Sequence, residues 1–211
     1  SDLWGKTITE TEKALKEKLG DKKFNAAIVG PAGENKLYLS AIMNDSHRAA
    51  GRGGSGAVMG SKNLKALVVS GNHTVTIADR EEMVKINKNI MEWQKNGPAA
   101  PFIKGFSEIG TTIFYDNGVL VGDAFVKNGL GAGTVDLKPE DITPITGPEM
   151  DKRWKRKKFA CAACPVGCGA HYKIDELGIE ETGRPEYETQ GSFCSQMLMS
   201  DPLVLNKCNT L

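Results

Sequence analysis

Apolar residues recur along the chain at helical spacing in some segments and in short branched runs in others. Helical spacing is clearest in residues 79–97, which begin with an aspartate suited to an N-cap and end at Gly97-Pro98. Four apolar residues follow one another there at steps of three and four: Met83, Ile86, Ile90 and Trp93. This segment is the strongest helix prediction in the chain.

The first 70 residues mix one expected helix with several expected strands. Thr7 and Glu10 form a capping-box pattern, and a helix is predicted from there to Gly20. Apolar or branched runs predict strands at 24–29, 36–43 and 66–69, and a glycine-rich stretch lies at 51–60. A helix combined with short strands of this kind predicts an α+β fold.

The remaining chain carries weaker patterns. Residues 105–148 are expected to be loop-rich, with only short helical candidates such as 111–115, and a domain boundary is placed near residues 75–79. Asp201-Pro202 is a good helix start, and the apolar residues after it continue to the last residue without a stop signal. We therefore expect a helix that the end of the sequence interrupts.

Composition excludes several classes of protein. The chain has 211 residues with 40% hydrophobic content, enough for one large or two small packed domains. A net charge of +1 predicts no strong attraction to nucleic acid or to an acidic membrane, and no apolar run is long enough for a transmembrane helix. The N-terminus does not have the pattern of a signal peptide. Five cysteines, three of them crowded together, favour metal binding in a reducing, cytoplasmic compartment over a disulfide framework.

Three cysteines within eight residues form a C-x2-C-x3-C motif: Cys161, Cys164 and Cys168. Small residues between them leave room for an iron–sulfur cube, whose usual ligands are four thiolates, so the motif predicts a cluster and a fourth ligand elsewhere. A zinc site normally shows a second C-x2-C pair, which this chain lacks, and a thioredoxin-like redox pair does not explain the third cysteine. A cluster is favoured, with zinc and three structural thiols as the alternatives.

A second candidate site is the stretch that carries Arg48 and Arg52 and has five glycines in residues 51–60. Glycines let the backbone approach a ligand closely, so that free N–H groups surround phosphate oxygens, and the arginines add charge-assisted hydrogen bonds. Neither the P-loop nor the dinucleotide-binding spacing is present. Composition alone leaves phosphate binding and an ordinary flexible basic loop equally open.

A third stretch, residues 183–189, places two glutamates on either side of a tyrosine. Glu188 could act as a general acid or base if it is buried near a metal, although solvated surface glutamates are the simpler interpretation. His47 and His171 are further candidate ligands, but a lone histidine is more often structural.

The two cysteines outside the motif are Cys194 and Cys208, and each could supply a fourth cluster ligand. A small buried thiol on a helix is the favoured interpretation for both. Residues 152–158 contain six lysines or arginines in seven positions, just before the motif. This basic run is interpreted as a solvated face, and as a bolder hypothesis it docks an acidic electron carrier.

In combination, these stretches resemble the tungsten-containing aldehyde:ferredoxin oxidoreductases. The shared text comprises GPAGEN at 30–35, AIMND at 41–45, HRAAGRGG at 47–54 and GAVMGSKNLKA at 56–66, followed in the family's order by the cysteine motif and by PEYE. The motifs in this order are specific, and the resemblance spans nearly the whole chain.

The resemblance implies a tungsten (sometimes molybdenum) ion held by two pterins, a Mg²⁺ ion bridging the pterin phosphates, and a [4Fe-4S] cluster that passes electrons to ferredoxin. It implies that the pterin-phosphate cradle includes Arg48, Ala49, Ala50, Gly51, Arg52 and Gly53. The backbone oxygen of Ala49 would bind Mg²⁺, and Glu188 would transfer protons near the tungsten. Cys161, Cys164 and Cys168 would bind the cluster.

The resemblance also implies a domain arrangement. Residues 1–76 would be the end of a β-rich pterin-binding domain, and residues 77–211 the start of a mostly helical domain that carries the cluster cysteines. The family's upstream and downstream parts are expected to lie outside this chain, with the fourth cysteine among them. The chain alone would then not hold the full cofactor.

The implied activity is oxidation of small aldehydes to carboxylic acids with ferredoxin as acceptor. No nucleic-acid or membrane partner is expected, and a homo-oligomer is left open. Two alternatives are a related reductase subunit that acts on aromatic acyl-CoA thioesters and a simple iron–sulfur electron carrier. A nucleic-acid binder ranks last, because the chain has a net charge of only +1.

Overall fold

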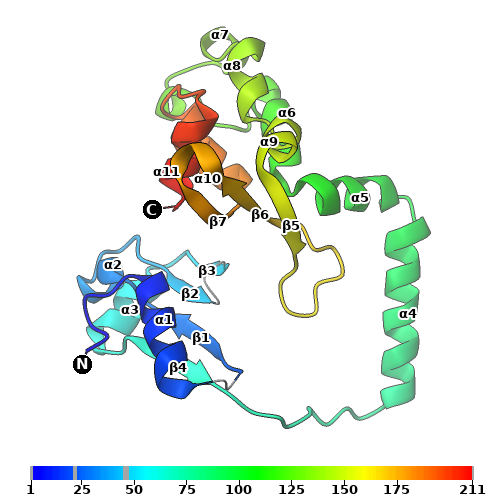
Figure 1. Cartoon of the computed structure of the whole chain (residues 1–211). Coiled ribbons are helices and arrows are strands. Elements are labelled where there is room, and N and C mark those ends of the chain that lie inside the picture. Colours follow the sequence, from blue (N-terminus) through cyan, green and yellow to red (C-terminus); the bar gives the residue numbers. More distant parts are fainter. Residues whose placement is uncertain (1, 21–22, 45–47, 211) are drawn as a thin grey trace. The chain divides into compact units, whose positions relative to one another are not determined.

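The computed structural model describes residues 2–20, 23–44 and 48–210, with the backbone alone at residue 156. The chain divides into two compact units, Ser1–Thr76 and Ile77–Leu211 (Figure 1). Both contain helices and a small antiparallel sheet, so the predicted α+β class is confirmed.

The first unit is built on a four-stranded antiparallel sheet with the strand order β3-β2-β1-β4. The strands are β1 (Asn25–Ile28), β2 (Ile42–Asn44), β3 (Arg48–Ala50) and β4 (Ala66–Val69). β1 lies centrally, where Ile28 pairs with Met43 on one side and with Ala66 on the other. β3 is the edge strand that follows residues 45–47.

Helix α1 (Ile8–Leu19) packs on this sheet, and it begins at the capping box that the sequence predicted. The Glu10 N–H donates to Thr7 Oγ1 at 3.3 Å, and the Thr7 N–H donates to the Glu10 carboxylate at 2.8 Å. Leu15 then packs with Ala26 and Ile28 of β1 in a small buried cluster. Local hydrogen bonds thus begin the helix, and apolar burial attaches it to the sheet.

The sequence did not predict two short helices of this unit, α2 (Pro31–Glu34) and α3 (Ser55–Ser61). The expected strand at 36–43 is wrong over most of its length, because Lys36 has φ +60° and the Ser40 N–H closes a turn onto Leu37 O. The end of the glycine-rich stretch is helical because its glycines allow close packing. A Cβ at Gly60 would overlap the carbonyl oxygen of Gly33.

A buried ion pair joins three parts of the first unit. Lys65 Nζ lies 2.6 Å from Glu34 Oε1, and the two side chains are 6% and 5% exposed. Lys65 also donates to Lys6 O at 2.6 Å, while the Glu34 carboxylate accepts from the Gly5 N–H at 2.8 Å. The N-terminal segment, α2 and the start of β4 are thereby held at one point.

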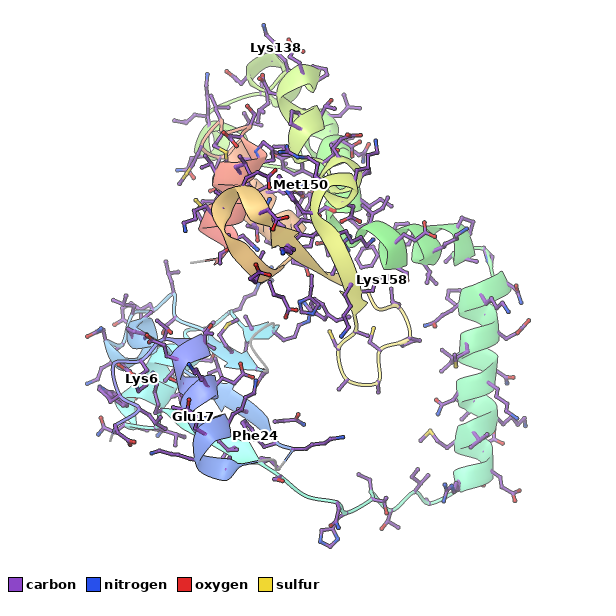
Figure 2. All side chains as sticks on the ribbon, in the orientation of Figure 1. Lys6, Glu17, Phe24, Lys138, Met150 and Lys158 are labelled. Carbon is purple, nitrogen blue, oxygen red and sulfur yellow. The ribbon has the colours of Figure 1, made fainter. Side chains whose placement is uncertain are left out.

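The second unit is mainly helical. Helix α4 (Arg80–Asn96) is the predicted amphipathic helix, yet none of its residues is buried, and Figure 2 shows its side chains projecting along its whole length. The expected loop region 105–148 is instead a series of short helices, which correct that prediction. They are α5 (Ala100–Ile109), η1 (Thr111–Phe114), α6 (Tyr115–Val121), η2 (Lys127–Gly129), α7 (Gly133–Asp136), α8 (Pro139–Ile142) and η3 (Thr143–Ile145).

A three-stranded antiparallel sheet follows helix α9 (Gly147–Trp154), in the order β5-β6-β7. Its strands are β5 (Lys155–Phe159), β6 (Gly169–Ile174) and β7 (Ile179–Gly183), with η4 (Asp175–Leu177) between the last two. The chain ends with α10 (Tyr187–Gln190), the π-turn η5 (Gly191–Ser195) and α11 (Pro202–Thr210), the last beginning at the predicted proline.

The core of the second unit lies between its short helices and this sheet. Its largest fully buried side chains are Tyr115, Leu137, Ile145, Met150, Tyr172, Ile174 and Leu205. Alternate residues of β6 point into this core, which fixes the hairpin formed by β5 and β6. Within the described ranges, no helix is both long and apolar enough to cross a membrane.

Candidate functional site

The cysteine motif forms the loop of the β5–β6 hairpin, drawn in yellow in Figure 1. Cys161 is exposed, whereas Cys164 and Cys168 are half-buried. The Cys164 N–H donates to Cys161 O at 3.0 Å, which curls the first half of the motif into a turn. The β-ladder closes this loop at both ends, because Phe159 pairs with Gly169 directly after Cys168.

The donor chemistry of this loop suits a cluster. Its side chains between the thiols are small, and thiolates are the ligands that iron–sulfur clusters prefer. Among the residues that the structure describes, no three His, Cys, Asp or Glu side chains converge on a point that could hold a single metal ion. A cube needs no such point, since its thiolates bind iron atoms at separate corners.

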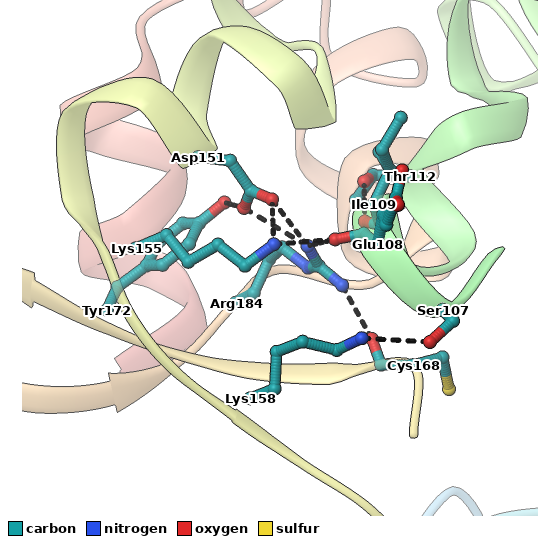
Figure 3. A network of polar contacts seen from close by, with 10 residues as sticks. All are labelled: Ser107, Glu108, Ile109, Thr112, Asp151, Lys155, Lys158, Cys168, Tyr172 and Arg184. Atoms are coloured by element: carbon teal, nitrogen blue, oxygen red, sulfur yellow. Dashed lines mark hydrogen bonds and ion pairs between the residues drawn. The ribbon is translucent and has the colours of Figure 1, made fainter. Parts of the chain in front are cut away.

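A polar network holds the last cysteine of the motif in place (Figure 3). Arg184, 3% exposed in its side chain, donates from one guanidinium nitrogen to Cys168 O at 2.5 Å. Its other terminal nitrogen donates to both carboxylate oxygens of Asp151, at 2.8 and 3.1 Å, and to Glu108 O at 3.2 Å. The guanidinium thus bridges Asp151 and the backbone of the motif, and these charge-assisted hydrogen bonds fix its orientation.

Two further side chains complete this network around Asp151. Lys155 Nζ donates to the Asp151 carboxylate at 2.8 Å and to Glu108 O at 2.6 Å. The Tyr172 hydroxyl donates to Asp151 Oδ1 at 2.7 Å. Burial, together with the neighbouring Asp151 charge, raises the pKa of Tyr172 far above its ordinary value, so its hydroxyl keeps its proton. Lys155 therefore departs from the solvated face predicted for the basic run.

The predicted phosphate-binding residues lie on and after the edge strand of the first unit. Arg48 is partly buried in β3, while Ala49, Ala50, Gly51, Arg52 and Gly53 are exposed. The outer edge of β3 pairs with no strand within the described ranges, so this segment presents backbone groups and one arginine to solvent. His47 lies outside the described residues.

Glu188 is exposed on α10 and borders a cavity of about 310 Å³ in the second unit. The other lining residues are Thr111, Phe114, Asp123, Glu186 and Tyr187. The cavity thus combines three carboxylates with one apolar ring. Glu186 lies in the same sequence motif as Glu188. Asp123 lies between α6 and η2, and Thr111 lies in η1; no sequence pattern pointed to either residue.

Hydrogen bonds orient the groups beside Glu188. Thr111 Oγ1 accepts from the Tyr187 N–H at 2.9 Å and donates to the Glu186 carboxylate. The Tyr187 hydroxyl donates to Asp123 at 2.8 Å. Burial and this carboxylate raise the pKa of Tyr187 to about 12, so the phenol stays protonated near neutral pH.

The remaining candidate ligands have structural positions. His171 lies on β6 beside the ring of Phe159, with its Nδ1 3.5 Å from a carboxylate oxygen of Glu181. Cys194 is fully buried in the core, and burial raises the pKa of its thiol to about 12. Cys208 is half-buried on α11. The expected role of Cys194 as a small buried thiol is confirmed.

A second, larger cavity of about 1140 Å³ lies between α4, α5 and the cysteine loop. Pro165 and Val166 of the loop line one part of it. We call it the lysine groove, because four lysines and only two glutamates border it: Lys88, Lys95, Lys104, Lys158, Glu92 and Glu108.

Two family models match the chain. Residues 1–71 match the N-terminal domain of aldehyde ferredoxin oxidoreductase, and residues 85–211 match domains 2 and 3 of the same family.

Individual relatives agree with this match. The tungsten-containing aldehyde ferredoxin oxidoreductases of Pyrococcus abyssi (strain GE5 / Orsay) and Thermococcus kodakarensis (strain ATCC BAA-918 / JCM 12380 / KOD1) are each 39% identical over 201 residues. An aliphatic sulfonate oxidoreductase, WOR-like subunit, of Pyrococcus furiosus is 30% identical over 208 residues. Each match covers 95% of this chain, which spans only 32% of each relative's length.

Among solved structures, the chain is similar to the active site complex BamBC of benzoyl coenzyme A reductase in complex with 1,5 dienoyl-CoA. The TM-score is 0.76 at 22% identity, over 99% of this chain and 32% of that chain. At this identity the likeness concerns the fold.

Proposed function

The chain belongs to the aldehyde ferredoxin oxidoreductase family, and we propose that it forms part of a longer enzyme that oxidises aldehydes to carboxylic acids. The observation that carries this proposal is the closed hairpin loop with three thiols, whose last member is held by the buried Arg184. The chain has five cysteines, three of them grouped in one loop, and this pattern supports metal binding in a reducing, cytoplasmic location.

In this proposal the two units divide the cofactors between them. Residues 77–211 bind a [4Fe-4S] cluster through Cys161, Cys164 and Cys168, with a fourth ligand outside this chain. Residues 1–76 contribute to the site of a tungsten (or molybdenum) bis-pterin. There the exposed segment 48–53 offers N–H groups and arginines to pterin phosphates, and the Ala49 carbonyl oxygen binds Mg²⁺.

The proposed reaction converts an aldehyde and water into a carboxylic acid, two protons and two electrons. The bound tungsten or molybdenum supplies the two-electron redox chemistry. Glu188 takes one proton from water as the water oxygen attacks the carbonyl carbon of the aldehyde. Tyr187 stays protonated beside it, and the ring of Phe114 lines the same cavity.

Ferredoxin is the proposed electron acceptor, and the lysine groove supports it. Ferredoxin is proposed to be acidic, and the groove carries an excess of lysines next to the cysteine loop. Complementary charge steers association and orients the partner, so electrons leave the cluster over a short path.

The proposal is tested on the full-length protein purified without oxygen. We expect tungsten or molybdenum, iron and acid-labile sulfide, together with aldehyde-dependent reduction of ferredoxin. Glu188→Gln should lower kcat by about 10²–10⁴-fold with unchanged metal content, as expected for a general base. The matched control Glu180→Gln, exposed on β7, should leave kcat unchanged.

Two outcomes would replace the proposal. Iron and sulfide without tungsten or molybdenum would indicate a simple electron carrier. Reduction of an aromatic acyl-CoA thioester without aldehyde oxidation would indicate the reductase alternative. The fold that the chain shares with benzoyl coenzyme A reductase keeps this alternative in view.

A further inference from the structure

We propose that Arg184 is a positioning residue that holds the third cluster thiolate and raises the reduction potential of the cluster. This inference rests on the proposed [4Fe-4S] cluster, and it goes beyond the ligand set because it assigns a function to the network behind the ligands. The motif Cys161–Cys168 carries none of these supporting residues, which come from α5, α9, β5, β6 and, for Arg184, the position directly after β7.

The contact between Arg184 and the motif is direct. One terminal guanidinium nitrogen donates to Cys168 O at 2.5 Å, so a permanent positive charge is in contact with the backbone of a ligand residue. Gly110 makes room for this contact, because a Cβ there would overlap the guanidinium and lie 2.8 Å from Cys168 O. Its φ of +77° also suits glycine.

The charges of the network do not cancel. Arg184 and Lys155 are positive, Asp151 is the one negative side chain that they share, and Glu108 takes part through its backbone carbonyl. Tyr172 stays neutral because burial and Asp151 raise its pKa. Lys158, bonded to Ser107 Oγ at 2.8 Å, adds a further cation on the same side (Figure 3).

A net positive charge behind the loop favours the form of the cluster with the additional electron. Arg184 is almost fully buried, so solvent and salt screen its charge only weakly. Hydrogen bonds and nearby charge are recognised determinants of cluster potential. The network therefore makes the cluster a better acceptor of electrons from the proposed metal–pterin site.

Opposite charge changes in the same network provide the test. In full-length protein, the midpoint potential of the cluster is measured by redox titration followed by electron paramagnetic resonance. Arg184→Gln should lower this potential by about 59 mV, which corresponds to a tenfold change in the one-electron reduction equilibrium. Asp151→Asn should raise it, because the positive charges lose their counter-charge.

Two controls separate this effect from a merely structural one. Arg184→Lys keeps the charge but loses the fork, so it should shift the potential less than Arg184→Gln does. Arg153→Gln removes a partly exposed arginine that pairs with Glu176 on the same unit, and it should leave the potential unchanged.

The inference fails if Arg184→Gln and Asp151→Asn leave the potential unchanged or shift it in the same direction. It also fails if both variants fold but contain no iron or sulfide, because Arg184 would then serve assembly alone. The absence of a cluster from the wild-type protein would instead overturn the proposed function, so the two failures are distinguishable.

Discussion

Two buried charged residues stabilise the contacts around them, one in each unit of the chain. Arg184 and Lys65 are each nearly excluded from solvent, and each bonds a carboxylate and a backbone carbonyl from a distant part of the chain. Burial makes such groups costly when one partner is removed, because the remaining charge cannot regain water. Their substitution therefore has larger effects than that of the many exposed lysines.

Lys65→Met should destabilise the first unit by about 3–5 kcal/mol, since it leaves the Glu34 carboxylate buried without its partner. The measurement is denaturant unfolding of the full-length protein, followed by a probe placed in residues 1–76. Lys16→Met, which removes a lysine that is 66% exposed and pairs with Glu12, is the control and should cost less than about 0.5 kcal/mol. Equal effects of both substitutions would contradict the assigned role of burial.

Cys194 should make stability depend on pH in the alkaline range. Burial raises the pKa of its folded thiol to about 12, above that of the unfolded chain at about 8.5. The contribution is fully present below the unfolded value and is lost as the pH rises through the folded one. Cys194→Ala should therefore show a shallower loss of stability than wild type between about pH 9 and 12. Parallel curves in urea unfolding would refute this.

Elements differ in how much of their structure was predictable. The helix after Thr7, the helix after Asp79 and strand β4 carry local signals, namely caps, apolar spacing and branched runs, and all three were predicted. Strands β5 to β7 were missed because β5 is a run of charged residues that forms a strand only by pairing with β6. Helix α3 was missed because its glycines serve packing, which local propensity does not register.

Gly60→Ala should separate α2 from α3. The added Cβ would overlap the carbonyl oxygen of Gly33, and neither helix backbone can give way as a flexible side chain could. We expect the free energy of unfolding to fall by about 1–3 kcal/mol, because the contact becomes overpacked. Gly71→Ala is the control, since its Cβ would meet no atom within 4 Å. The thermal midpoint of the full-length protein reports both, and an unchanged midpoint for Gly60→Ala would contradict the packing described.

At the scale of the whole molecule, the sequence predicted which stretches carry chemistry but not what supports them. The cysteine motif and the arginine–glycine stretch are compact in sequence. The spacing of the first favoured a cluster, whereas the second stayed open between phosphate binding and a flexible basic loop until the family resemblance was considered. Asp151, Arg184 and Glu108 lie up to 76 residues apart, and only the fold brings them together. Supporting groups of this kind have no sequence pattern, which is why they were missed.

The lysine groove leads to a prediction for the proposed complex with ferredoxin. Lys95→Glu with Lys104→Glu should slow ferredoxin reduction about tenfold or more at low ionic strength, and the difference should shrink as salt is added. Stopped-flow measurement of ferredoxin reduction provides the rates. The pair Lys13→Glu and Lys16→Glu on α1 changes the net charge equally and should have little effect. A salt-independent loss would point to misfolding instead of docking.

The strand pairing at both ends of the cysteine loop also has a consequence for thermal unfolding. Because Phe159 and Gly169 pair immediately outside the three thiols, the loop cannot open without the ladder between β5 and β6 also opening. Bleaching of the proposed iron–sulfur cluster on heating should then coincide with the loss of this sheet, as one cooperative event. The cofactor and the hairpin would share a single melting temperature.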